Sequence, residues 1–271
     1  MKTLADAKRV VIKIGTSTLT YETGRINIRR FEKLCKTLSD IKNSGREIVL
    51  VSSGAVAVGV AKMGLPCRPQ DIPSKQAAAA VGQCELMYLY DKLFLEQNHK
   101  VAQVLLTRDV LESENRAVNA RNTFERLFSM GAIPIVNEND TVSIEELEFG
   151  DNDTLSAMVT ALTEADGLIL LSDIDGLYAQ DPRKNPEAQL IPLVTKIDKR
   201  IESIAGGSGS NRGTGGMATK IQAAKIALVC GAPMAIINGA DPDLLYDLFE
   251  GKPVGTLFLP EEAQSLKPKS I

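Results

Sequence analysis

Apolar and polar positions along the chain follow two spacings, which predict strands and helices in turn. Short apolar runs are typical of strands buried on both faces of a parallel sheet, whereas apolar positions three and four apart indicate one face of a helix. Strands are predicted at 9–14, 47–51, 101–106, 133–136, 167–171, 190–194, 234–237 and 256–258. Helices are predicted at 28–41, from 55, at 77–95, through 124–128, from 151, at 217–230 and at 244–249.

Because these strands and helices alternate almost throughout, we expect an α/β fold. Its form would be a three-layer αβα sandwich, doubly wound around a mainly parallel central sheet. Polar turns follow several strands and should gather at the carboxyl edge of the sheet, where such folds bind ligands. These turns contain Ser53, 139–140, 150–154 and 172–173, and a short hairpin or flap is expected at 141–149.

The stretch from 150 to 154 places two acids and an amide at a predicted helix start. Leu155, Met158, Val159 and Leu162 follow with the spacing of one helical face. A helix start exposes unpaired N–H groups and the positive end of the dipole, so it suits either a capping side chain or an anionic ligand. We interpret Asp151 as a plain N-cap, and two further polar residues indicate more than a cap.

Length, composition and charge narrow the class of protein. The 271 residues suit one large α/β domain or two small ones, and 44% hydrophobic with 24% charged residues is typical of a soluble globular protein. A formal net charge of −3 argues against binding nucleic acid or an anionic membrane over the whole chain. An anionic ligand would therefore have to be met by local lysine or arginine.

Cysteine and histidine usage excludes several kinds of site. The four cysteines form no metal-binding spacing, and three of them fall in helix-like apolar patterns, so we expect buried, reduced thiols. No apolar run approaches membrane-spanning length and the N-terminus has no apolar signal region, so a cytoplasmic protein is expected. The single histidine, His99, is expected in a surface turn, which leaves carboxylates, amides and lysines for chemistry.

Two lysines are candidates for binding phosphate. Lys13 lies in an otherwise apolar strand, where it either reaches water at the edge or meets an anion. Lys220 follows a loop rich in glycine, which either wraps phosphates with backbone N–H groups or is a plain linker. The loop matches neither the Walker A pattern nor the dinucleotide fingerprint, which disfavours P-loop NTPases and Rossmann dehydrogenases.

If both lysines and Asp151 and Asp153 met at one phosphate, transfer to an ionised carboxylate would need no general base.

Seven sequence blocks, taken together, carry a resemblance. In order along the chain and without a large gap, they resemble the glutamate 5-kinases of the amino acid kinase family. The similarity covers about 8–259, and blocks in register are far more specific than any one of them. The blocks are 11–15, 51–56, 79–83, 105–108, 134–140, 150–153 and 213–220.

This resemblance implies a role for each matching residue. Lys13 and Lys220 would stabilise the charge of a transferring phosphoryl group, and Asp153 would hold the two ammonium groups in place. Glutamate would be bound by Ser53, Asp140 and Asn152, with Asp140 facing the α-ammonium. The residues expected at ATP, besides Lys13, are Ser172 and Asp173 along the nucleotide, and Thr214, Gly215, Gly216, Met217, Ala218, Thr219 and Lys220 around its phosphates.

The implied reaction is the ATP-dependent phosphorylation of the γ-carboxylate of L-glutamate. Its product would be L-glutamyl 5-phosphate, the first step of proline biosynthesis, with Mg²⁺ accompanying ATP. A homo-oligomer and proline as a feedback inhibitor are further expectations. The chain would be one kinase domain over 8–259 with a short tail at 260–271, and it resembles the form without the PUA domain that many members carry.

Two alternatives remain from the sequence. One is another family member, acting on N-acetylglutamate, aspartate, carbamate or UMP. An acid at position 140 favours a free α-ammonium and would oppose an acylated amine or a phosphate. The other is a non-catalytic amino-acid or nucleotide sensor on the same fold, which would have no need to keep Lys13, Asp153 and Lys220.

Overall fold

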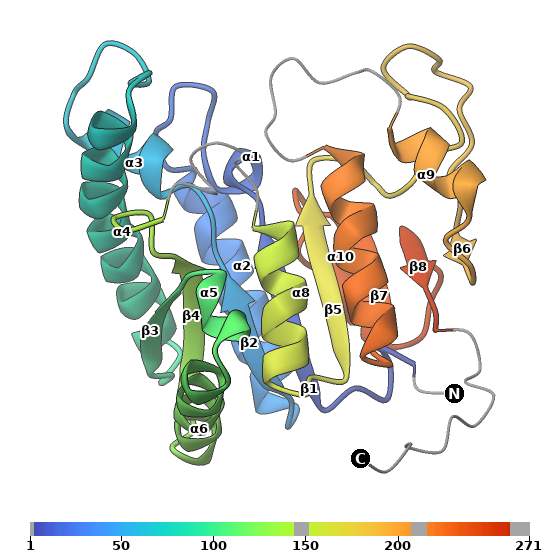
Figure 1. The fold of residues 1–271 in the computed structure, drawn as a ribbon, viewed down its shortest axis with the longest axis horizontal. Coiled ribbons are helices and arrows are strands. Elements are labelled where there is room, and N and C mark those ends of the chain that lie inside the picture. The colour runs from blue at the N-terminus through green and yellow to red at the C-terminus, as the bar shows by residue number, and fades with distance from the viewer. Residues whose placement is uncertain (1–2, 144–151, 207–215, 261–271) are drawn as a thin grey trace.

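A sheet of eight strands forms the middle of the part of the chain that the structure describes, residues 3–143, 152–206 and 216–260 (Figure 1). In this computed structural model the strand order is β3-β4-β2-β1-β5-β7-β8-β6. The pairs are parallel except for β7 with β8. The strands are β1 (Arg9–Ile14), β2 (Glu47–Val51), β3 (Val101–Leu106), β4 (Ile133–Glu138), β5 (Gly167–Ser172), β6 (Leu193–Val194), β7 (Met234–Asn238) and β8 (Thr256–Phe258).

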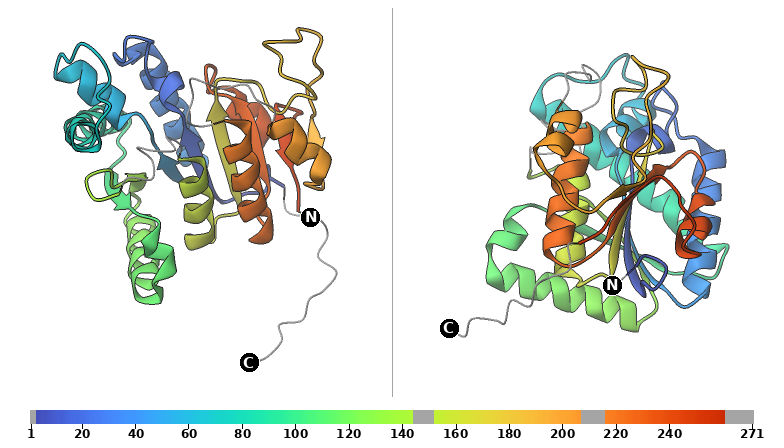
Figure 2. Two further views of the ribbon diagram at one scale, coloured as in Figure 1. Left: turned by 45° about the horizontal axis from the view of Figure 1, so that its top comes forward. Right: turned by 90° about the vertical axis from the view of Figure 1, so that its right-hand side faces the viewer.

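Helices cover both faces of this sheet, which confirms the three-layer architecture (Figure 2). One face carries α2 (Ile28–Asn43), α3 (Ala55–Lys62), α4 (Ile72–Leu95) and α11 (Leu244–Phe249). The other carries α6 (Glu114–Ser129), α8 (Asp153–Leu162), α9 (Lys199–Ala205) and α10 (Met217–Val229). Two short helices, α1 (Thr16–Leu19) and α5 (Asp109–Glu112), follow β1 and β3.

Strand β1 lies at the centre and contributes to both hydrophobic cores. Val10, Ile12 and Ile14 belong to the core beneath α2, whereas Val11 belongs to the core beneath α8. This division follows from the alternation of side chains along a strand. Lys13 therefore lies on the same face as Val11, beneath α8.

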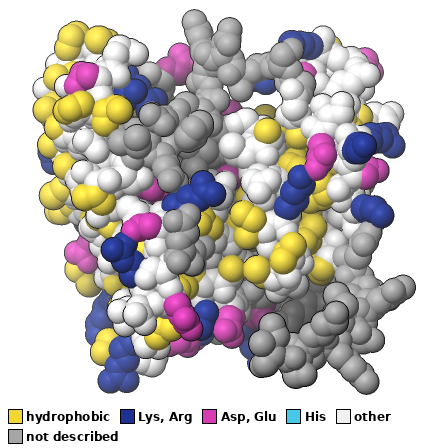
Figure 3. Space-filling model, viewed as in Figure 1, with side chains coloured by type: hydrophobic (Ala, Val, Ile, Leu, Met, Phe, Trp, Pro, Cys, Tyr) yellow, Lys and Arg dark blue, Asp and Glu magenta, His cyan; other side chains and the backbone are white. Residues whose placement is uncertain are grey.

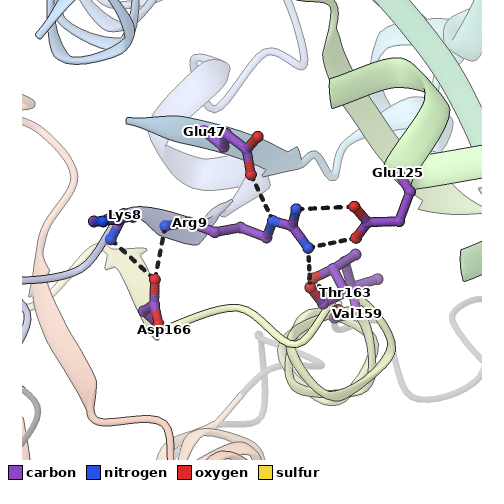
Figure 4. Close-up of polar contacts among 7 residues, drawn as sticks. All are labelled: Lys8, Arg9, Glu47, Glu125, Val159, Thr163 and Asp166. Atoms are coloured by element: carbon purple, nitrogen blue, oxygen red, sulfur yellow. Dashed lines mark hydrogen bonds and ion pairs between the residues drawn. The ribbon is translucent and has the colours of Figure 1, made fainter. Parts of the chain in front are cut away.

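The amino end of β1 is tied to its neighbours by Arg9 (Figure 4). The Arg9 guanidinium contacts the carboxylates of Glu47 at 2.7 Å and Glu125 at 2.6 Å, and it donates to the Thr163 carbonyl at 2.6 Å. Thr163 ends α8, so the guanidinium binds a carbonyl at the negative end of that helix. One side chain thus connects β1, β2, α6 and α8.

Several element boundaries differ from the predicted ones. Strand β4 continues to Glu138, so Asn137 and Glu138 lie in the strand and the polar turn begins later. Helix α4 begins at Ile72, where the Asp71 side chain caps it by accepting from Ser74 N. The strand predicted at 190–194 is reduced to Leu193–Val194, with Leu190 in an isolated bridge to Tyr178.

The predicted start of α8 and the expected state of the cysteines also need correction. Helix α8 begins at Asp153 with Asn152 at the N-cap position, and Asp151 lies outside the described residues, as does most of the predicted hairpin. Cys35 is buried, but Cys67, Cys84 and Cys230 are exposed, because their positions fall on the outer sides of their segments. In the described residues no helix is long and apolar enough to cross a membrane.

Candidate active site

The carboxyl ends of β1, β2, β4 and β5 meet at one edge of the sheet, at the top of Figure 1. Lys13 lies at the end of β1, Ser53 follows β2, Asp140 follows β4 and Ser172 ends β5. The sequence predicted that Ser53, Asp140 and Ser172 would gather at this edge. Helix α8 begins at the same edge and brings Asn152 and Asp153 to it.

Asp153 joins two lysines from distant parts of the chain. The Lys13 ammonium lies 2.7 Å from Asp153 Oδ1, and the Lys220 ammonium lies 2.9 Å from Asp153 Oδ2. The three side chains are almost completely buried, with relative exposures of 5% for Lys13, 7% for Lys220 and 0% for Asp153. Asp153 thus holds two ammonium groups close together, and a pair of cations at a strand end and a helix start suits an anionic ligand.

The start of α10 adds uncharged donors beside this charge. Its N-cap is Gly216, which has no side chain that could accept from the first N–H groups of the helix. The Thr219 hydroxyl lies 3.1 Å from Asp153 Oδ2 and 2.7 Å from the Gly216 carbonyl. Helix starts of this kind bind phosphate. Of the loop residues predicted at ATP, Gly216 to Lys220 are here, while Thr214 and Gly215 lie outside the described residues.

A chain of amide hydrogen bonds holds Asn152. Its Nδ2 donates to the Ser52 carbonyl and to Asn137 Oδ1, both at 2.6 Å. Asn137 Nδ2 in turn donates to Gln83 Oε1 at 2.9 Å. Both amide hydrogens of Asn152 are therefore used, and its Oδ1 remains as a buried acceptor that no described group satisfies.

Two further buried oxygens also lack a hydrogen bond. Within the described residues, Ser53 Oγ and Asp140 Oδ1 have no hydrogen-bond partner. Unsatisfied buried polar atoms are rare in native proteins and call for a ligand. Because Asn152 Oδ1 and an ionised Asp140 can only accept, a ligand that donates hydrogen bonds, such as an ammonium group, would satisfy both.

Burial alters the acidity of Asp140. Loss of hydration, together with the nearby Glu138 carboxylate, raises the pKa of Asp140 to about 7, and the Arg68 charge opposes the shift. Glu138 is itself buried and accepts from the Ser143 hydroxyl at 2.7 Å. Asp140 therefore changes its charge near neutral pH.

Two residues expected at the nucleotide lie at the carboxyl end of β5. Ser172 is buried and its hydroxyl lies 3.2 Å from Asp173 Oδ1, while Asp173 is exposed. The segment that follows is ordered by Asp175, whose carboxylate accepts from Asn238 at 2.8 Å and from the Tyr178 hydroxyl at 2.7 Å. Ser172 thus ends the strand that pairs with β1, and Asp173 follows it directly, at the same edge of the sheet as Lys13.

Sequence reasoning missed the amide chain. Asn137 and Gln83 were inside recognised blocks but received no role, and Glu138 was assigned to a turn. The one sequence signal for Asn137 and Gln83 is that each polar side chain adjoins an apolar run. Partners separated by fifty-four residues cannot be paired from spacing alone.

Comparison with known proteins gives consistent results. The sequence pattern of the amino acid kinase family matches residues 8–238. The chain is 54% identical over 267 residues to the glutamate 5-kinase of Clostridium perfringens, covering 97% of this chain and 99% of that protein. It is 52% identical to the glutamate 5-kinase of Carboxydothermus hydrogenoformans, of which it covers 71%, while 97% of this chain is matched.

Solved structures share the fold at low sequence identity. The UMP kinase of Bacillus anthracis superposes with a TM-score of 0.63 at 16% identity, covering 93% of this chain and 96% of that one. A substrate complex of an isopentenyl phosphate kinase superposes with a TM-score of 0.64 at 18% identity, covering 93% and 99%. These two kinases act on different substrates, so the shared fold does not identify the phosphate acceptor.

Proposed function

Because this chain belongs to the amino acid kinase family, we propose that its site transfers a phosphoryl group from ATP to an amino acid, and that the amino acid is L-glutamate. The bond formed joins a γ-carboxylate oxygen to the transferred phosphorus, and the bond broken joins that phosphorus to the bridging oxygen of ATP. The products are L-glutamyl 5-phosphate and ADP. This is the first step of proline biosynthesis.

The observation that carries the proposal is the contact of Lys13 and Lys220 with opposite oxygens of Asp153. Phosphoryl transfer depends mainly on positioning and on stabilising charge. The two ammonium groups would bind the oxygens of the transferring group, and Asp153 would keep the two nitrogens at a fixed separation. The start of α10 would bind phosphate through its N–H groups.

The acceptor explains why the site has no histidine. A γ-carboxylate is already ionised at neutral pH, so the reaction needs no group to remove a proton. His99, the single histidine, lies at the far end of α4, before β3, where its ring nitrogen contacts the Ser39 carbonyl. The chemistry therefore rests on lysines, a carboxylate and backbone groups.

Glutamate recognition is assigned to the unsatisfied oxygens of Ser53, Asp140 and Asn152. The α-ammonium would donate to Asp140 and Asn152, and the Ser53 hydroxyl would donate to a carboxylate of the substrate. An N-acetyl group would remove the positive charge that Asp140 attracts. This favours glutamate over N-acetylglutamate as the acceptor.

Magnesium accompanies ATP and neutralises phosphate charge during transfer. In the described residues no group of three or more His, Cys, Asp or Glu side chains could hold a metal ion. Mg²⁺ is usually bound by substrate phosphates, several waters and only one or two carboxylates, so its binding with ATP needs no such group. Lys13 and Lys220 would bind the remaining phosphate charge.

The test is a measurement of ADP release with Mg-ATP and each candidate acceptor in turn. Glutamate should support turnover, with formation of a hydroxamate when hydroxylamine is present. N-acetylglutamate, aspartate and UMP should be poor acceptors. Turnover with N-acetylglutamate but not with glutamate would contradict the proposal.

A homo-oligomer with proline as an inhibitor completes the proposed function. Hydrophobic side chains gather at the left edge of the face drawn in Figure 3, over α3 and α4, and Met63, Tyr88 and Leu95 of these segments are exposed. Tyr88 and Leu95 are two helical turns apart, so they share one side of α4. Light scattering after size exclusion would give the mass, and proline should raise the KM for glutamate if it binds the same oxygens.

A further inference from the structure

Gln83 lies on α4 and is not among the residues assigned to glutamate or ATP. It belongs to the block 79–83, which is part of the family resemblance without a role in the chemistry above. Its Oε1 accepts from Asn137 Nδ2 at 2.9 Å, across the space between α4 and β4. Asn137 thus lies between Gln83 and Asn152, and Asn152 in turn lies between Asn137 and a bound amino acid.

The hydrogen bonds fix which end of each amide faces which neighbour. The Ser52 carbonyl can only accept, so it takes Asn152 Nδ2, and Asn137 turns its Oδ1 toward Asn152 and its Nδ2 toward Gln83 Oε1. The backbone N–H of Glu138 also donates to Asn137 Oδ1, at 3.0 Å. Asn152 must then present Nδ2 to Asn137, which leaves its Oδ1 as the atom facing the ligand.

Close packing between α3 and α4 sets the position of Gln83. A Cβ on Gly82 would lie 1.8 Å from the Ala55 carbonyl oxygen, and a Cβ on Gly59 would lie 1.8 Å from the Ala78 carbonyl oxygen. The two backbones can approach this closely only because glycine has no side chain. Gln83 follows Gly82 directly, so the same contact holds it opposite Asn137.

We propose that Gln83 is a positioning residue that makes the site selective for acceptors with a free amino group. It acts through Asn137 on Asn152, holding the acceptor oxygen of Asn152 in place against the substrate ammonium. The inference rests on the proposed glutamate kinase activity. Its effect should appear only for ligands that carry an ammonium group.

Removing the acceptor at position 83 should disorder this arrangement. In Gln83→Leu the Asn137 Nδ2 hydrogens are buried without an acceptor, so the Asn137 amide turns to find one. Its Oδ1 then shifts away from Asn152, which keeps only its bond to the Ser52 carbonyl and no longer holds its own Oδ1 firmly against the ligand. Losing one hydrogen bond to a charged group at this site should raise the KM for glutamate about tenfold.

The experiment compares glutamate with glutarate, which has both carboxylates and no amino group. For Gln83→Leu the KM for glutamate should rise, while kcat, the KM for ATP and the inhibition constant of glutarate stay unchanged. Gln83→Glu keeps an acceptor oxygen and should restore the preference for glutamate. Gln83→Met, which is unbranched and of similar length, should repeat the Leu result if Leu impairs folding.

Gln97→Leu is the matched control, because Gln97 follows the far end of α4 and takes no part in the amide chain. It should leave both ligands unaffected. Equal weakening of glutamate and glutarate in Gln83→Leu, or an unchanged KM for glutamate, would overturn the inference. If the unsubstituted protein did not phosphorylate glutamate, the proposed function would fail instead, and the same assay distinguishes the two results.

Discussion

Asn152 and Asp153 are neighbours in sequence at the start of α8, yet their side chains have separate sets of partners. The Asn152 amide reaches the Ser52 carbonyl and Asn137, whereas the Asp153 carboxylate reaches Lys13 and Lys220. The first set faces the proposed amino-acid site and the second the proposed phosphate site. One helix start therefore fixes the distance between the acceptor and the phosphoryl donor, which is the geometric requirement of the reaction.

Replacing Lys220 with alanine should reduce turnover without abolishing glutamate binding. The ammonium group would stabilise charge that grows in the transition state, and loss of one such donor typically lowers kcat about 10²- to 10³-fold. Single-turnover kinetics would give the rate, and calorimetry with glutamate would give the affinity. Lys225→Ala is the control, since Lys225 pairs with Glu202 on the exposed side of the same helix. Unchanged turnover in Lys220→Ala would refute the role.

Replacing Asp153 with asparagine should lower both stability and activity. Two buried ammonium groups would lose their shared counter-charge, and breaking a buried ion pair in this way costs about 3–5 kcal/mol. Urea unfolding would measure the loss. Asp247→Asn, which removes an exposed partner of Lys252, should change stability little. A stability loss in Asp153→Asn no greater than in that control would show that the pair is not stabilising.

The KM for glutamate should rise as the pH falls. Burial, reinforced by Glu138, raises the pKa of Asp140 to about 7, so the carboxyl group is neutral below that pH and charged above it. The substrate ammonium attracts only the charged form, and each pH step below the pKa should therefore weaken binding, approaching about tenfold per unit. KM measured from about pH 8 to about pH 6 tests this. In Asp140→Asn the KM should be high and nearly independent of pH over that interval.

Replacing Arg9 with methionine should destabilise the fold while the site residues stay intact. The guanidinium binds Glu47, Glu125 and the Thr163 carbonyl and lies 4.2 Å from the centre of the Phe128 ring. Losing these contacts should lower the free energy of unfolding by about 2 kcal/mol. Arg183→Met, at an exposed pair with Asp181, is the control and should change little. Equal losses in the two variants would contradict the role given to Arg9.

Much of the fold could be predicted from the sequence, because buried strands and amphipathic helices leave periodic patterns. The apolar run of β1 and the helical spacing after Asp153 are examples, and Gly45 and Gly231 follow α2 and α10 with positive φ, as is typical of glycine after a helix end. Helix and strand boundaries that depend on a single contact were harder to predict. The start of α4 depends on the Asp71 cap, and β4 includes Asn137 because its partner strand β3 is equally long.

The candidate site was partly predictable for a different reason. Ligand-binding residues of a parallel sheet follow its strands, so Ser53, Asp140 and Ser172 could be brought to one edge from strand order alone. Lys13 was marked by the cost of a charge in an apolar run. Contacts between buried polar groups, such as Gln83 with Asn137, depend on how α4 crosses the sheet, and no periodic pattern encodes that. The functional roles of all these residues remain predictions for the experiments above.

Strand β1 presents Arg9, Val11 and Lys13 toward α8 and Val10, Ile12 and Ile14 toward α2. Deleting or inserting one residue within the strand would exchange these two sets of side chains. Lys13 would then point into the apolar layer under α2. Helix α8 would lose the contact of Asp153 with Lys13 at its start and that of Thr163 with Arg9 at its end. In the evolution of this chain, length changes within 9–14 should therefore be excluded, even where substitutions of one aliphatic residue by another are tolerated.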